Sequence, residues 1–334
     1  MDVETFCRQS HILIVAGKGG VGKTTMTAAI ARMASRHGLS VLIVELEGKS
    51  GITGAFDLKD DLGYEEVELQ AEHAVQPEHA GAGGPAQRWV RARRITPDDA
   101  LVEYLVDHGL KRISKRLVSS GVVDVVSTAI PGIRDVLVLG KVKQLERDEM
   151  ADLIVVDAPA TGHAITFLTS AAGLVNAARG GPLRSQAQDV VDLLSDPARC
   201  RVMLVTLPEE MPVSETIESA FTLEDKAGVQ LGPVIVNACD PAPVGLDQPA
   251  AEVAASSGLT VDPAHLRALE EARLFRLERH AISASQLERL ARDLPLPQLL
   301  VPSVGAASIG RAETDTLAEA LGAAVGDLNG EEPE

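Results

Sequence analysis

Aromatic residues are scarce in this sequence: five Phe, two Tyr and one Trp make up 2% of 334 residues. The core must therefore be built mainly from aliphatic side chains. Basic residues are also in deficit, because 31 Lys and Arg face 48 Asp and Glu, which gives a net charge of −17. Proteins that grip nucleic-acid phosphates need a basic surface, and single-strand binders add aromatic platforms. We therefore expect no nucleic-acid partner.

Cysteine pairs and long hydrophobic runs are missing as well. Cys7, Cys200 and Cys239 are far apart and form no Cys-x-x-Cys pair, so we expect neither a disulfide framework nor a zinc site within one chain. No stretch approaches the roughly 18 apolar residues of a membrane span. The start, MDVETFCRQS, is polar and acidic where a signal peptide would be basic and then apolar. We expect a cytoplasmic protein that is not an integral membrane protein.

Short apolar runs alternate with helical patterns along the chain. The run HILIVAG from His11 to Gly17 predicts a buried strand, Thr24 to His37 predicts a helix, and Val41 to Leu46 predicts a second strand. This order is a βαβ unit, which closes right-handed with parallel strands. Similar strand-like runs occupy Leu153 to Gly162, Arg201 to Glu210, Gly232 to Pro241 and Pro297 to Gly305. The pattern predicts an α/β fold with a doubly wound, mostly parallel sheet.

A glycine-rich loop lies between the first predicted strand and helix. It consists of Gly17, Lys18, Gly19, Gly20, Val21, Gly22, Lys23, Thr24 and Thr25, and it fits the pattern G-x-x-x-x-G-K-[ST]. Glycines let backbone N–H groups turn toward phosphates, while the helix N-terminus adds partial positive charge. In this design Lys23 reaches the β- and γ-phosphate oxygens, and the Thr24 hydroxyl ligates Mg²⁺. The loop predicts a P-loop ATPase with ATP and Mg²⁺ as cofactors.

Asp157 directly follows the apolar residues of the strand-like run from Leu153. The general P-loop design places an acidic residue at this point to hold the Mg²⁺ shell. We therefore predict Thr24 and Asp157 as the metal-binding residues.

Two motifs resemble a known family. Lys18 supplies the early lysine of the deviant Walker A loop, and Asp157 to His163 reads D-A-P-A-T-G-H. The second motif is similar to the D-T-A-P-T-G-H segment of the arsenite-pump ATPase (ArsA) and Get3 family, which includes tail-anchored-protein targeting factors. The resemblance implies a switch segment that senses the γ-phosphate, with Gly162 offering its N–H. It also implies that Lys18 reaches across a dimer interface to the partner's nucleotide.

Weaker matches spread the resemblance along the chain. Pro131 to Asp135 looks like the family's P-G-I/T-D-E segment, and Leu207 to Met211, followed by Glu215, looks like its L-P-E…E run. The resemblance implies that Asn237 reads the adenine and that Pro302 lies in a loop closing over the base. An amide suits base recognition because it offers both a donor and an acceptor.

Switch I departs from the family pattern. The family has D-P-A-H after its second strand, whereas this chain has Glu47-Gly48-Lys49-Ser50. Glu47 keeps the carboxylate that would orient the attacking water, on an arm one methylene longer. Because phosphoryl transfer depends on positioning, three outcomes are open: a working Glu47, slow hydrolysis, or ATP binding beside a competent paralogue. We predict slow ATPase activity, with Lys18, Lys23, Glu47 and Asp157 as catalytic residues.

These patterns predict one P-loop domain over residues 1–330. The expected nucleotide-binding core covers residues of about 10–60, 151–180, 200–245 and 295–325. A helical insertion is expected over about 97–150 and 164–198. We also expect a flexible loop at 71–87 and a frayed acidic tail at 330–334. A long helical stretch is expected from about Pro263 to Arg292.

The family resemblance implies a dimeric switch that couples Mg-ATP-driven closure to a helical surface. Its partner would be a second copy or a paralogous ATPase, and its client a membrane protein, a lipid or another protein. One alternative is a nucleotide-binding regulatory subunit with weak or no ATPase activity. Others are the ATPase subunit of an arsenite or anion efflux system, and a partition-type ATPase, against which the charge and the D-A-P-A-T-G-H segment argue.

Overall fold

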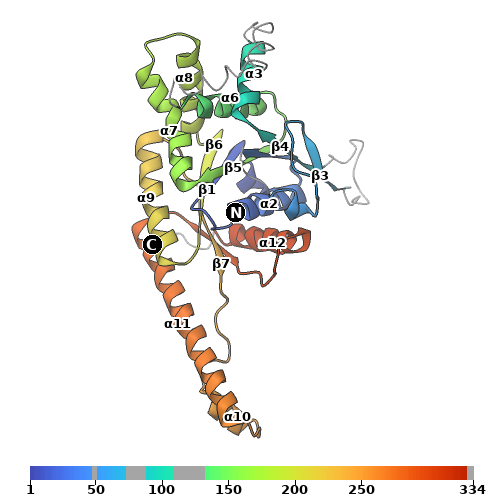
Figure 1. Cartoon of the computed structure of the whole chain (residues 1–334), viewed down its shortest axis with the longest axis vertical. Helices are drawn as coiled ribbons and strands as arrows, with labels where there is room; N and C mark the ends of the chain where they lie inside the picture. The colour runs from blue at the N-terminus through green and yellow to red at the C-terminus, as the bar shows by residue number, and fades with distance from the viewer. Residues whose placement is uncertain (47–50, 73–87, 108–131, 329–334) are drawn as a thin grey trace.

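The computed structural model describes residues 1–46, 51–72, 88–107 and 132–328 (Figure 1). Its eight strands form one sheet in the order β3-β4-β2-β5-β1-β6-β7-β8, and every neighbouring pair is parallel except β3 with β4. The strands are β1 Ile12–Gly17, β2 Val41–Leu46, β3 Val67–Glu72, β4 Arg88–Ile95, β5 Leu153–Ala160, β6 Cys200–Thr206, β7 Val234–Cys239 and β8 Gln298–Pro302. The predicted α/β fold with a doubly wound, mostly parallel sheet is confirmed.

Helices cover both faces of this sheet. The helices are α1 Val3–Cys7, α2 Lys23–Arg36, the 3-10 turn η1 Gly54–Phe56, α3 Pro97–Asp107, α6 Ile133–Arg147, α7 Thr161–Ala177, α8 Pro182–Ser195, α9 Glu210–Ala227, α10 Ala250–Ser256, α11 Pro263–Asp293 and α12 Arg311–Asp327. None of the helices in the described part of the chain combines the length and the apolar character that a membrane crossing requires.

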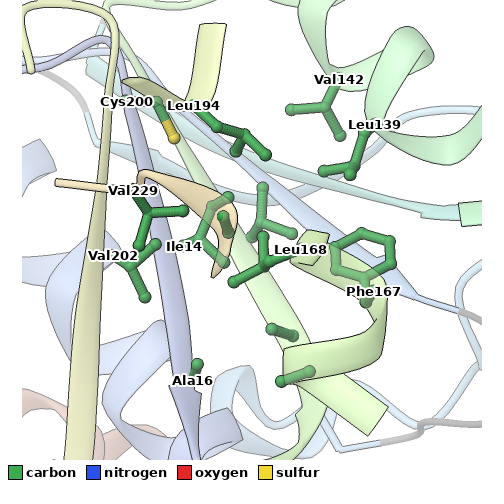
Figure 2. Close-up of a cluster of buried hydrophobic side chains, with 14 of the residues drawn as sticks. Ile14, Ala16, Leu139, Val142, Phe167, Leu168, Leu194, Cys200, Val202 and Val229 are labelled. Atoms are coloured by element: carbon green, nitrogen blue, oxygen red, sulfur yellow. The ribbon is translucent and has the colours of Figure 1, made fainter. Parts of the chain in front are cut away.

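The alternation of side chains along β1 builds two separate cores. Ile12, Ile14 and Ala16 face α6, α7, α8 and α9, whereas Leu13 and Val15 face the layer of α1, α2 and α12. Figure 2 shows part of the first core, where β1 packs against Leu139, Val142, Phe167, Leu168 and Leu194. Since both faces are covered, all six residues of β1 are buried, which explains its continuous apolar run.

The edge formed by β3 and β4 was not predicted from the sequence. β4 carries four arginines, which obscure the alternation that buries Val90 and Ala92. Two of these arginines stack on aromatic rings, Arg91 on Trp89 at 4.3 Å and Arg93 on Tyr64 at 4.4 Å. Such stacking lets charged side chains lie along a sheet edge.

The structure refines several expected boundaries. Residues 71 and 72, predicted as the start of the 71–87 loop, are the last two residues of β3, and 73–87 lie outside the described residues. Helices α3, α6 and α8 lie within the ranges 97–150 and 164–198 expected for the helical insertion, and α7 begins three residues before the second range; residues 108–131 are not described. The tail 330–334 lies outside the described residues too.

Helix α11 forms an arm that extends away from the body of the molecule, with α10 at its far end (Figure 1). Its 31 residues correspond to a length of about 46 Å. Leu290, near the end that joins the body, is its fully buried residue and packs in the first core.

Candidate nucleotide-binding site

The glycine-rich loop joins the end of β1 to the start of α2. Gly20 and Gly22 have backbone φ angles of +88° and +93°, and residues that carry a Cβ rarely adopt such angles. A Cβ on Gly17 would lie 2.3 Å from the Val205 carbonyl oxygen of β6, and one on Gly22 would lie 2.4 Å from Asn237 Nδ2. The neighbouring strand ends therefore require glycine at both positions.

Lys23 is the first residue of α2 and is almost completely buried. Its Nζ donates a hydrogen bond to the backbone carbonyl of Lys18 at 2.8 Å, so the ammonium group lies across the loop. A cation held against the loop's own backbone, at a helix N-terminus, creates local positive charge suited to a polyphosphate.

Thr24 and Asp157 meet although 133 residues separate them in sequence. The Thr24 hydroxyl donates to Asp157 Oδ2 at 2.7 Å, and Asp157 is completely buried near the end of β5. A hydroxyl and a carboxylate beside a phosphate-binding loop are the oxygen ligands that Mg²⁺ prefers, shared with substrate phosphates. Within the described residues no group of three or more His, Cys, Asp or Glu could hold a metal without such a substrate.

A second buried carboxylate, which was not predicted from the sequence, lies beside Asp157. Glu45 of β2 pairs in register with Asp157 of β5, and Arg94 of β4 donates to Glu45 Oε2 from Nε at 3.1 Å and from Nη2 at 2.9 Å. Burial raises the pKa of the Glu45 carboxyl, the charge of Asp157 acts in the same direction, and Arg94 opposes both. The only signal in the sequence is a charged residue inside the apolar run VLIVEL.

Asn237 ties the end of β7 to the phosphate loop. Its Nδ2 donates to the Val21 carbonyl at 2.9 Å, and its Oδ1 accepts from the backbone N–H of Ala238 at 2.8 Å. Ala238 has a φ of +56°, in the left-handed region. Because an amide has two N–H groups and two acceptor lone pairs, these bonds leave one of each for another group.

Pro302 lies next to this strand end. It pairs in register with Cys239, and the N–H of Ser303 donates to the Cys239 carbonyl at 3.0 Å. The two positions expected near the adenine, Asn237 and Pro302, are therefore brought to adjacent strand ends.

Lys18 has a partner within its own chain. Its Nζ lies 2.6 Å from Glu215 Oε1 on α9, and both side chains are about one-third exposed. Glu215 belongs to the L-P-E…E motif, and nothing in the sequence indicates Lys18 as its partner.

The D-A-P-A-T-G-H segment covers the end of β5 and the first turn of α7. Gly162 is the second residue of α7 and is exposed, with nothing within 4 Å of the place a Cβ would occupy. A Cβ on Gly19 would lie 3.9 Å from the Cβ of Ala160, the residue before α7. Val21 is buried and Thr25 half-buried, while Glu47 lies outside the described residues.

A hollow of about 330 Å³ opens beside the ends of β6, β7 and β8. It is lined by Leu207, Pro208, Glu209, Ala238, Asp240, Phe275, Glu278, Arg279, Ile282, Ser283 and Ser303. Asp240 holds the arm at this point, because its Oδ2 lies 3.2 Å from Arg279 and 3.5 Å from Arg276 of α11.

The amino-acid sequence of this chain is similar to those of several known proteins. The chain is 37% identical over 238 residues to the ATPase BagA of Mycobacterium tuberculosis, covering 69% of this chain and 65% of that protein. It is 28% identical over 245 residues to an arsenical pump-driving ATPase of Acidiphilium multivorum, covering 70% and 36% of the two chains. The ATPase GET3B of Arabidopsis thaliana is 25% identical over 265 residues, or 67% and 63%.

The chain therefore spans just under two thirds of the length of the mycobacterial relative. The model of the anion-transporting ATPase family matches residues 10–177, just over half of the chain, and includes the phosphate loop, Asp157 and Gly162. The expected resemblance to ArsA and Get3 is thus confirmed, and the chain belongs to the anion-transporting ATPase family.

Proposed function

We propose that this protein binds ATP with Mg²⁺ at the loop 17–25 and hydrolyses it. The observation that carries the proposal is the bond between the Thr24 hydroxyl and the buried Asp157, placed beside a glycine loop and Lys23. This set offers donors to phosphate and oxygen ligands to a metal at one point. Membership of an ATPase family supports the same conclusion.

Each residue then has a defined task. Lys23 neutralises the β- and γ-phosphates, Thr24 and Asp157 hold Mg²⁺, and the N–H of Gly162 binds the γ-phosphate. Bound Mg²⁺ would stabilise the negative charge that accumulates on the phosphate oxygens during phosphoryl transfer. Asn237 and Pro302 hold the base, and Glu47 orients the attacking water.

We further propose that the protein works as a dimeric switch. Lys18 would exchange Glu215 for the nucleotide of a partner, which is either a second copy or a paralogous ATPase. Closure would be transmitted through the segment after Asp157 to α7, and from there to the helical layer of α3, α6 and α8, where a client binds. The position of α7 directly after Ala160 supports this route.

The test measures nucleotide affinity by calorimetry and phosphate release with and without Mg²⁺. Lys23→Ala should weaken ATP binding about tenfold or more, because charge-assisted hydrogen bonds contribute roughly 1.5–3 kcal/mol. Asp157→Asn should reduce Mg²⁺-dependent phosphate release by at least about tenfold, since it removes a charged metal ligand. Lys226→Ala, an exposed lysine in the last turn of α9, is the control and should change neither quantity.

Two results would contradict parts of the proposal. Equal ATP affinity of the wild type and Lys23→Ala would place the nucleotide elsewhere. A second contradicting result would be tight ATP binding with no phosphate release, also when a partner is present, and no difference between the wild type and Glu47→Gln. This result would exclude hydrolysis and favour the alternative of a regulatory subunit.

A further inference from the structure

The hollow beside the ends of β6, β7 and β8 begins next to the phosphate loop. Asn237 donates to the Val21 carbonyl of the loop at 2.9 Å, and the following residue, Ala238, lines the hollow. On the neighbouring strand end, Ser303 lines it directly after Pro302. The volume of about 330 Å³ lies within the range of small-molecule pockets, roughly 300–1,000 Å³. A ligand whose phosphates lie at the loop can therefore extend into this hollow.

The arm forms one wall of the hollow. Phe275, Glu278, Arg279 and Ile282 of α11 line it, and spacings of three, four and seven residues from Phe275 place them on one face of the helix. This wall is tied to the strand end, because Arg279 Nε donates to Asp240 Oδ2 at 3.2 Å. Phe275 is nevertheless 62% exposed. The wall thus presents an aromatic surface to a ligand in the hollow.

The charges around the hollow indicate which part of a nucleotide it suits. Its lining carries three acidic side chains, Glu209, Asp240 and Glu278, and one basic side chain, Arg279. Asp240 and Arg279 neutralise each other, so the two glutamates leave the hollow negative. Negative charge repels phosphate and carboxylate groups, but carboxylates accept hydrogen bonds from N–H donors. An uncharged nucleobase with an amino group fits both this charge and the aromatic surface.

We propose that the arm completes the base-binding site, with Phe275 stacking on the base and Glu278 accepting a hydrogen bond from its exocyclic amino group. This role rests on the proposed binding of ATP at the loop 17–25. Glu278 lies about one helical turn from Phe275, at the edge of a ring stacked there. Adenine presents an amino group where guanine presents a carbonyl oxygen, which a carboxylate repels. The arm therefore selects adenine over guanine.

The first test compares ATP with inorganic tripolyphosphate, which has phosphates but no base, by calorimetry on the full chain with Mg²⁺. Phe275→Ala should weaken ATP binding about tenfold, because stacking on an aromatic side chain contributes that much. It should leave tripolyphosphate binding unchanged. Phe275→Trp keeps an aromatic surface and should bind ATP as the wild type does. Phe221→Ala is the matched control, since Phe221 of α9 is 54% exposed and does not line the hollow.

The second test measures the preference for ATP over GTP. Glu278→Gln should lower this preference about tenfold, because an amide can donate to the guanine oxygen that a carboxylate repels. Glu271→Gln removes an exposed carboxylate of the same helix that does not line the hollow, and it should leave the preference unchanged. Circular dichroism checks that each variant is folded.

Two results would overturn the role of the arm. They are a Phe275→Ala variant that binds ATP as the wild type does or loses tripolyphosphate equally, and a Glu278→Gln variant with an unchanged preference for ATP. A wild type that binds ATP and tripolyphosphate equally tightly would also overturn it, while leaving the phosphate site intact. A wild type that binds neither would contradict the proposed ATP site itself.

Discussion

The contact between Lys18 and Glu215 places a carboxylate beside the phosphate loop, with Lys18 Nζ 2.6 Å from Glu215 Oε1. If Lys18 binds the nucleotide of another subunit, as we propose, its ammonium group has to leave Glu215. The carboxylate would then compete with ATP for this lysine, and its negative charge would add repulsion at the loop.

We expect Glu215→Gln to tighten ATP binding about two- to fivefold, because partly exposed ion pairs contribute roughly 0.2–1 kcal/mol. Calorimetric titration with ATP measures the change. Glu218→Gln, an exposed carboxylate on the same helix, should have no effect. An equal gain in a Lys18→Ala background would show that Glu215 acts without Lys18.

The loop pattern spans nine residues and singles out Lys23 and Thr24, and the end of an apolar run singles out Asp157. The structure brings Thr24 and Asp157 together, while the roles of all three residues stay predictions. Glu45 was missed because its partner Arg94 lies 49 residues away, on a strand that was itself unrecognised. Glu215 had no assigned partner because 197 residues separate it from Lys18.

Among the elements, β4 was not predicted at all, whereas α11 was predicted in extent but not in its position relative to the body. β4 was missed because arginines occupy positions where aromatic stacking replaces apolar burial. α11 was predicted within one residue of its bounds, because its helix-forming residues run without interruption. Its projection from the body was not predictable, since an amphipathic pattern does not say which surface covers the apolar face.

The arm depends on its attachment to the body. We expect Leu290→Ala to lower the free energy of unfolding by about 2–4 kcal/mol, because it opens a cavity in the first core. Leu269→Ala removes the same atoms from a side chain of the same helix that is 54% exposed, and should change stability by less than about 0.5 kcal/mol. Urea denaturation followed by circular dichroism compares them, and similar losses would mean that Leu290 does not anchor the helix.

At the scale of the whole molecule, one sheet is shared by two cores. Cys7 lies in the core with α2 and α12, and Cys200 lies in the core with α6 to α9 (Figure 2). Burial raises the pKa of both thiols to about 12. At pH 8 only about one thiol in 10,000 would then be ionised, and the thiolate is the reactive form.

We expect Cys7 and Cys200 to be unreactive toward a thiol reagent at pH 8 in the native protein. Both should become reactive over the same range of urea concentration, because neither helical layer can keep its packing after the sheet separates. Pulsed alkylation with peptide mass spectrometry distinguishes the two sites. Labelling of one cysteine at a clearly lower urea concentration would show that the two faces open independently.

The two-core arrangement explains why the fold class could be predicted from the sequence. Apolar runs such as that of β1 require cover on both faces, which leaves few architectures for a chain that alternates strands and helices.

The arm leaves the sheet after β7 and returns to it at β8, and these two strands are neighbours. It also lies beyond residues 10–177, the part of the chain that the model of the anion-transporting ATPase family matches. An excursion with adjacent exit and entry points can be lengthened, shortened or replaced during evolution without shifting the strands on either side. The length of the arm can thus change while the phosphate loop stays the same.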